Sequence, residues 1–222
     1  MKKFSQVFIS AYIIAAIFHL FSITAGYQLA EMVTKVLLMP LLMLYVFSES
    51  LSKKLLSLVF LALFLSWLGD IFLLKSETEM YFILGLGAFL FAHVAYLFAF
   101  RKLVYKTEKR KVGILSVLPF LIYAVVLIAF IFSSLGEMLV PVLAYAVAIT
   151  AMGIASAMRK GRTNTYSFYL VLSGAISFIL SDSGIAINRF HKPFDAAPVF
   201  IMLTYIIAQY NIATGCVVHL RQ

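Results

Sequence analysis

Eight apolar stretches, each long enough to cross a lipid bilayer, limit the fold of this sequence more than any other feature. About 20 helical residues suffice to cross roughly 30 Å of hydrocarbon. Inside lipid, only helices and closed barrels satisfy every backbone hydrogen bond. The stretches lie at about residues 5–25, 29–48, 55–75, 79–100, 112–134, 137–158, 166–188 and 195–219. We therefore predict an all-α, polytopic membrane bundle of about eight transmembrane helices, forming a single integral membrane domain over residues 1–222.

Composition supports this class. The chain is 64% hydrophobic and 12% charged, whereas soluble proteins are roughly 45–50% apolar and about 25% charged. The net charge is +9. The basic residues cluster in short connections between apolar stretches, where Lys and Arg normally set topology. We therefore expect no binding to nucleic acid.

Basic residues alternate between the two ends of the predicted helices. Fourteen of the 18 lie on one side, leaving four on or near the other: Lys35, Lys75, Arg189 and Lys192. The positive-inside rule then predicts a multi-pass protein of the cell membrane with both termini in the cytoplasm. A second interpretation takes the first stretch, up to Gly26, as a signal peptide, whose removal leaves seven spans.

Two aspartates interrupt the apolar stretches. Asp70 lies within residues 60–74 and Asp182 within residues 174–188, both otherwise almost wholly apolar. Ionisable groups at such depth face the protein interior and are usually functional. The third and seventh helices are predicted to run the same way, which puts the two carboxylates at one level. The simpler alternative is a buried ion pair, Asp182 with Arg189 or Asp70 with Lys35.

Other polar residues are predicted at a similar depth. Lys35, Asn188 and Arg189 fall in the outer halves or at the ends of their helices, and His93 lies about 20 Å along the fourth helix. Together they predict a polar cavity in the outer half of the membrane. Each has a duller interpretation: Lys35 can extend to the headgroups, His93 can bond a core carbonyl, and Arg189 can anchor the interface. Pro40 inside a helix frees a carbonyl and predicts a kink.

The segments around the two aspartates are weakly similar to each other, residues 64–70 to residues 178–182. An internal duplication would give two parallel four-helix halves with one aspartate in each.

An ordered set of motifs resembles the YhhN-type membrane family, whose characterised animal members are lysoplasmalogenases. The motifs are residues 35–40 (KVLLMP), 66–70 (SWLGD), 85–96 (GLGAFLFAHVAY), 181–190 (SDSGIAINRF) and 205–209 (YIIAQ). They cover most of the chain. The resemblance implies a hydrolase that cleaves the vinyl ether of a lysoplasmalogen, releasing a fatty aldehyde and a glycerophospho-headgroup.

The residues suit this chemistry. Cleavage of a vinyl ether begins with protonation of the double bond, and paired carboxyl groups commonly divide acid and base roles. We expect Asp70 and Asp182 to share these roles in either order, without a cofactor. Substrate-binding candidates are Lys35 and Arg189 for phosphate, with Asn188 beside them, and His93, Tyr96, Tyr205 and Gln209 for water or the ether oxygen, or as the cavity floor.

Three alternatives stay open. A metal held by Asp70, Asp182 and His93 is an alternative activator of water. A transporter that uses the aspartates as a proton relay is the main rival function. A lipid-binding module without turnover is the third. For the enzyme, the expected partners are a lysophospholipid substrate and the surrounding membrane lipids.

Overall fold

The computed structural model describes residues 2–49, 53–105 and 113–221. Four of the basic residues counted above, Lys106, Lys109, Arg110 and Lys111, lie outside these ranges, as does residue 112, where the predicted fifth stretch begins. All regular secondary structure in the described part is helical, and its eight α-helices are α1 (Lys2–Ala25), α2 (Gln28–Ser48), α3 (Lys53–Leu73), α4 (Glu79–Lys102), α5 (Leu118–Ile131), α6 (Leu139–Ala157), α7 (Thr165–Phe190) and α8 (Ala197–Leu220).

All of these helices except α5 are long and apolar enough to cross a membrane. The chain is therefore a multi-pass membrane protein, as its sequence predicted. The prediction for residues 112–134 was too long, because α5 covers 14 residues, a rise of about 21 Å. Pro119 stands in its first turn, and two 3₁₀ turns, Phe132–Ser134 and Gly136–Met138, replace its continuation.

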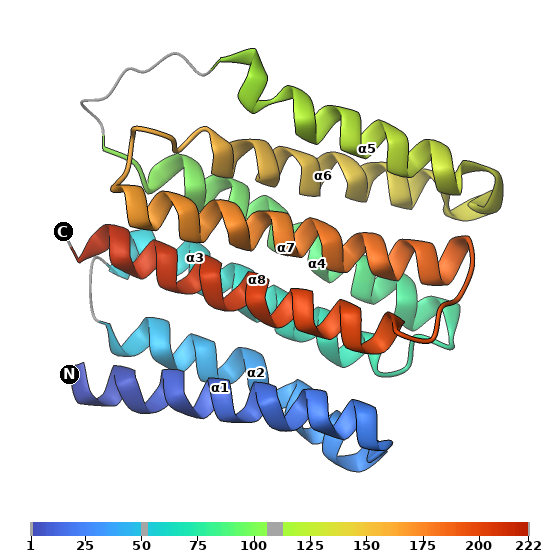
Figure 1. Cartoon of the computed structure of the whole chain (residues 1–222), viewed down its shortest axis with the longest axis horizontal. Coiled ribbons are helices and arrows are strands. Elements are labelled where there is room, and N and C mark those ends of the chain that lie inside the picture. The colour runs from blue at the N-terminus through green and yellow to red at the C-terminus, as the bar shows by residue number, and fades with distance from the viewer. Residues whose placement is uncertain (1, 50–52, 106–112, 222) are drawn as a thin grey trace.

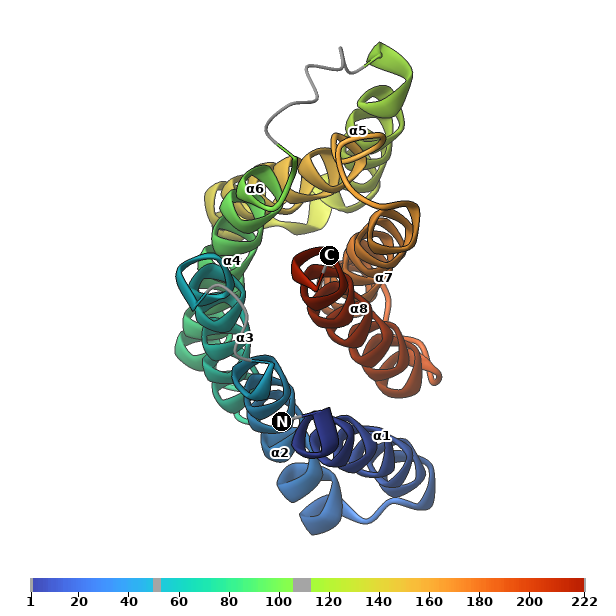
Figure 2. The ribbon, with the colours of Figure 1, turned by 90° about the vertical axis from the view of Figure 1, so that its left-hand side faces the viewer.

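The helices form an arc around a central hairpin. Figure 2 shows α1, α2, α3, α4, α6 and α5 in sequence around the arc, with α7 and α8 on its concave side. Helix α7 packs against α6, and α8 contacts α1, α2 and α3. Figure 1 shows the two termini at the same end of the bundle. The α7–α8 hairpin thereby brings its side chains to those of the first four helices.

Close approach of α3 and α4 depends on small residues. A Cβ on Gly85 of α4 would lie 2.8 Å from Leu73 Cδ2 of α3, and a Cβ on Gly69 of α3 would lie 2.5 Å from the ring of Phe89. Gly87, two residues beyond Gly85, has nothing within 4 Å of its Cβ position. The two helices therefore pack closely on both sides of Asp70 along α3.

A hydrogen bond joins α2 to α3 close to Pro40. Pro40 has no N–H to bond the carbonyl of Val36, four residues earlier. The indole Nε1 of Trp67 donates to that Val36 oxygen over 2.9 Å. Because Trp67 and Asp70 are three residues apart, they share one face of α3. The bond therefore sets Lys35, the neighbour of Val36, beside the aspartate's helix.

At the end of the bundle that carries the termini, two basic residues have structural partners. Arg221 bonds Glu49 Oε2 through Nε over 2.7 Å. Arg159 is buried and donates to Ser167 Oγ over 2.8 Å, and burial lowers the pKa of its guanidinium.

The possible duplication stays a prediction. Within each half of the chain, consecutive helices pack against each other. Across the halves, α4 also packs against α6, and α8 packs against α1, α2 and α3. The two halves therefore share one interior.

Candidate active site

Asp70 lies near the end of α3, away from solvent and lipid. Its residue is 2% exposed, and its Oδ2 accepts a hydrogen bond from the Tyr205 hydroxyl of α8 over 2.7 Å. Lys35 of α2 interacts with it electrostatically. The carboxyl group therefore has a hydrogen-bond donor from α8 and, more than 4.0 Å away, the cation of Lys35 on α2.

Asp182 has different surroundings. Its Oδ2 accepts a hydrogen bond from the Tyr145 hydroxyl of α6 and lies 3.5 Å from His93 Nε2 of α4. No described residue forms a hydrogen bond with its Oδ1. The Asp182 side chain is 9% exposed, whereas that of His93 is fully buried.

Aromatic rings connect the two aspartates. The Phe178 ring of α7 lies 5.5 Å from the Tyr205 ring and 4.6 Å from the His93 ring, measured between centroids. Tyr205 bonds Asp70, and His93 contacts Asp182. The two carboxyl groups are also within electrostatic range of each other. They belong to one cluster, as the sequence suggested from their depth.

In the described part of the chain, neither aspartate lies within 4.0 Å of a Lys or Arg nitrogen. The alternative of direct ion pairs, Asp182 with Arg189 or Asp70 with Lys35, is therefore absent from this structure. No three His, Cys, Asp or Glu side chains among the described residues are arranged to share a metal ion.

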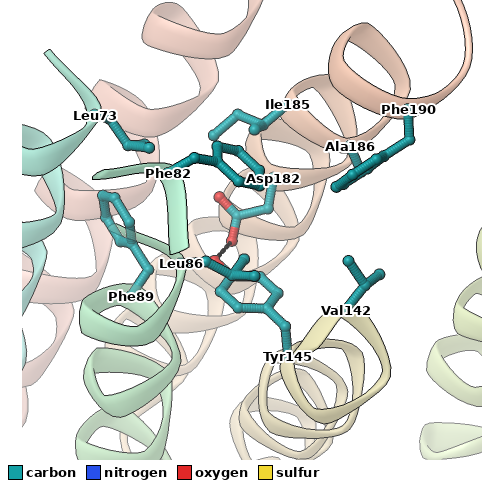
Figure 3. Close-up of a pocket in the computed structure, with 10 residues that line it drawn as sticks. All are labelled: Leu73, Phe82, Leu86, Phe89, Val142, Tyr145, Asp182, Ile185, Ala186 and Phe190. Atoms are coloured by element: carbon teal, nitrogen blue, oxygen red, sulfur yellow. Dashed lines mark hydrogen bonds between the residues drawn. The ribbon is translucent and has the colours of Figure 1, made fainter. Parts of the chain in front are cut away.

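An apolar cavity of about 50 Å³ reaches Asp182. Figure 3 shows the carboxyl group in its wall, bonded to Tyr145 and surrounded by apolar side chains. A second cavity of about 60 Å³ between α5, α6 and α7 is also lined by Tyr145 and Asp182. Since one water needs roughly 10–15 Å³ measured this way, each cavity has room for water beside the carboxyl group. The lining of the first is Leu73, Phe82, Leu86, Phe89, Val142, Tyr145, Asp182, Ile185, Ala186 and Phe190.

Arg189 lies at the edge of the first cavity. Its guanidinium carbon is 4.9 Å from the centre of the Phe82 ring, and Phe82 packs edge-on against Phe190 at 5.9 Å. Both rings belong to the cavity wall. Arg189 is exposed. Asn188, its neighbour, accepts a bond from the Phe194 backbone N–H over 3.3 Å, which ties the α7–α8 connection to the helix.

The remaining candidates lie deeper. Tyr96 donates to Gln209 Oε1 over 2.5 Å, and the two residues are fully buried. Gln209 follows Tyr205 by one turn of α8, so this bond lies beneath the Asp70–Tyr205 pair. Tyr96 and Gln209 thus lie beneath the cluster and line neither of the two cavities, so their role stays a prediction.

Sequence reasoning missed Tyr145 and Phe178. Tyr145 is flanked by Ala144 and Ala146 in an apolar run, and nothing there separates it from a lipid-facing tyrosine. Phe178 is one of 21 phenylalanines. The only signal in the sequence is that Phe178 precedes Asp182 by one helical turn and so shares its face.

Fold and cluster together define a class: a multi-pass helical membrane protein with two carboxyl groups in its interior. Residues 30–216 match the model of the YhhN family, so the chain belongs to that family. No solved structure matches it.

Three curated relatives are each 30% identical to the chain. The first is a lysoplasmalogenase of Mycobacterium tuberculosis, matched over 69% of this chain and 58% of the relative. The second is lysoplasmalogenase TMEM86A of Bos taurus, over 72% and 65%. The third is lysoplasmalogenase TMEM86B of Sus scrofa, over 68% and 60%. The chain thus spans less than two thirds of the length of these relatives.

Proposed function

We propose that this protein is a membrane hydrolase of the lysoplasmalogenase type. It cleaves the vinyl ether of a lysoplasmalogen to a fatty aldehyde and glycerophosphoethanolamine or glycerophosphocholine. The observation that carries the proposal is the cluster of two buried carboxyl groups, one of which stands in the wall of an apolar cavity. The names of the relatives favour this enzyme over a transporter.

The reaction needs an acid, water and a place for one long chain. Protonation of the double bond produces an oxocarbenium ion, water adds to it, and the hemiacetal collapses to aldehyde and alcohol. A carboxyl group in a low-dielectric cavity retains its proton more readily than in water, which suits it to donate near neutral pH. The proposal places the chain against the apolar side chains that surround the Asp182 carboxyl group.

The phosphate of the substrate is assigned to Arg189. This residue follows Asp182 by seven positions, a rise of about 10.5 Å along α7, and lies on the same face. The guanidinium lies over Phe82, which belongs to the wall of the cavity that also contains Asp182. Arginine recognises phosphate with paired hydrogen bonds, so phosphate at Arg189 would put the vinyl ether beside Asp182.

Aldehyde release tests the activity directly. Purified protein is incubated with lysoplasmalogen or with its saturated ether analogue, and aldehyde is measured. Only the vinyl ether should react. Asp70→Asn and Asp182→Asn should each lower turnover by about 10²-fold or more while the protein stays folded. Aldehyde from neither substrate, under conditions in which the protein is folded, contradicts the proposal.

The proposed orientation puts both termini in the cytoplasm and the aspartate cluster in the outer half of the membrane. Its test uses sealed vesicles of known orientation, an impermeant thiol reagent and a Cys216→Ala background. Lys192→Cys, between α7 and α8, should be labelled from the outer face. Lys160→Cys, between α6 and α7, is the matched control and should be labelled from the opposite face. The reverse pattern contradicts the orientation.

A further inference from the structure

The two aspartates differ in their access to the cavities. Among the described residues that line the two cavities at the site, the only carboxylate is Asp182. Its Oδ2 receives both polar contacts, from Tyr145 and His93, and this leaves Oδ1 to face the cavity. Asp70 is buried behind, with Tyr205 at its Oδ2. Substrate in the cavity therefore meets Asp182 and not Asp70.

They differ equally in the charges around them. Asp70 has the cation of Lys35 within electrostatic range. The polar neighbours of Asp182 are the phenol of Tyr145, the imidazole of His93 and Asp70 itself. The cation on its own helix, Arg189, is exposed and lies over Phe82.

Charge balance then decides where a proton resides. Buried charges are stable only when they are compensated, and two nearby carboxyl groups in low dielectric commonly share one proton. With Lys35 charged and Asp70 ionised, a protonated Asp182 makes the cluster neutral. The opposite arrangement, with the proton on Asp70, leaves the charged carboxylate farther from the lysine.

We propose, resting on the function proposed above, that Asp182 is the acid that touches the substrate and that Asp70 acts only through its charge. The Oδ1–H of Asp182 transfers its proton to the vinyl carbon that is not bonded to the ether oxygen, and the double-bond electrons form the new C–H bond. The positive charge of the resulting oxocarbenium ion is stabilised by the Asp70 carboxylate. Tyr145 positions the acid by donating a hydrogen bond to Oδ2.

The rest of the cycle restores the acid. Water adds to the oxocarbenium carbon and gives a proton to Asp182, which returns to its neutral form. The hemiacetal then breaks its bond to the glycerol oxygen. Its hydroxyl loses a proton, the glycerol oxygen gains one, and aldehyde and alcohol leave.

The pH dependence of residual turnover separates the two roles. In Asp182→Asn the remaining acid is hydronium, so the residual rate should fall about tenfold for each unit of pH. Asp70→Asn should also be slow, but without that dependence, because Asp182 still donates the proton. Small carboxylic acids such as formic and acetic acid should restore turnover to Asp182→Ala, the stronger acid more effectively, and should not restore Asp70→Ala.

Each alternative pattern has a clear meaning. The assignment is overturned if the residual rate falls tenfold per pH unit in Asp70→Asn instead of Asp182→Asn, in both variants, or in neither. It is also overturned if the added acids restore turnover to Asp70→Ala. Elution as a single species and an unchanged melting curve show that the isosteric asparagine variants are folded. If wild-type protein releases no aldehyde, the proposed function has failed. If wild type is active and the variants show another pattern, only the division of roles has failed.

Discussion

The hydrogen bond from Trp67 to the Val36 carbonyl predicts a specific energetic coupling between Trp67 and Pro40. Without the indole N–H, that carbonyl has neither the helical partner removed by Pro40 nor its replacement from α3. A buried carbonyl left unpaired costs about 1–3 kcal/mol. Hydrogen bonds between membrane helices average about 0.6 kcal/mol and reach about 1.7. We expect Trp67→Phe to lower the free energy of unfolding by about 1 kcal/mol.

Pro40→Ala is the compensating change, because alanine restores the helical N–H to Val36. The substitution should therefore stabilise the Trp67→Phe protein by about 1 kcal/mol more than it stabilises wild type. A double-mutant cycle measures this difference. Replacement of Trp67 by β-(3-benzothienyl)alanine, which keeps the ring size and lacks the N–H, is the matched control and should behave like Trp67→Phe.

The assay is unfolding by sodium dodecyl sulfate in mixed micelles, followed by far-UV circular dichroism. Fluorescence is unsuitable for the series because Trp67 is the single tryptophan of the chain. A coupling energy near zero, with Pro40→Ala acting equally in both backgrounds, refutes the reasoning. An effect of Trp67→Phe that the benzothienyl residue does not reproduce points to ring volume instead of the hydrogen bond.

Three further predictions concern packing, capping and the acid. Gly85→Ala should lower the free energy of unfolding by about 1–3 kcal/mol, because the new methyl meets Leu73 at 2.8 Å, whereas Gly87→Ala, with open space, should be neutral or stabilising. Asn164→Ala removes the side-chain cap of α7 and should cost about 1 kcal/mol, with Asn164→Asp as the silent control; equal melting curves contradict this. Tyr145→Phe should lower kcat by about tenfold, as expected for loss of a hydrogen bond worth about 1.4 kcal/mol, with KM nearly unchanged in steady-state assays.

The bundle was predictable because each span can be identified from its own local composition. The boundaries of α7 and α8 follow from apolar runs that end at charged or proline-containing connections. Helix α5 was predicted too long at both ends, because residues 114–117 before it and Phe132 after it continue the apolar run but form 3₁₀ turns or the start of the helix instead of α-helix. Gly136 begins the second of the turns that follow α5, with a φ of 49° that is costly for most other residues.

The depth of the site residues along their helices could be predicted from the sequence, but which helices face one another could not. Helical rise put Asp70 and Asp182 at one level, because that requires only a residue count and alternating helices. Which helix faces which is decided by packing between distant segments, so the sequence did not pair Tyr145 with Asp182 or Trp67 with Val36. Arg189 shows the same limit: its face was predicted, but its position over Phe82 depends on the contact of α4 with α7.

The bond between Tyr205 and Asp70 joins residues 135 positions apart, and this has a consequence for biogenesis. During synthesis α3 enters the membrane long before α8 exists, with an aspartate that costs roughly 2.5–3.5 kcal/mol to insert. Lys35 lies on the helix made just before, so α2 and α3 can enter together as a hairpin of opposite charges. Asp70 then lacks the hydrogen bond from Tyr205 until the α7–α8 hairpin has been made and has packed against the other helices. A nascent chain arrested before α8 should therefore be a better substrate for membrane quality-control proteases than the finished protein.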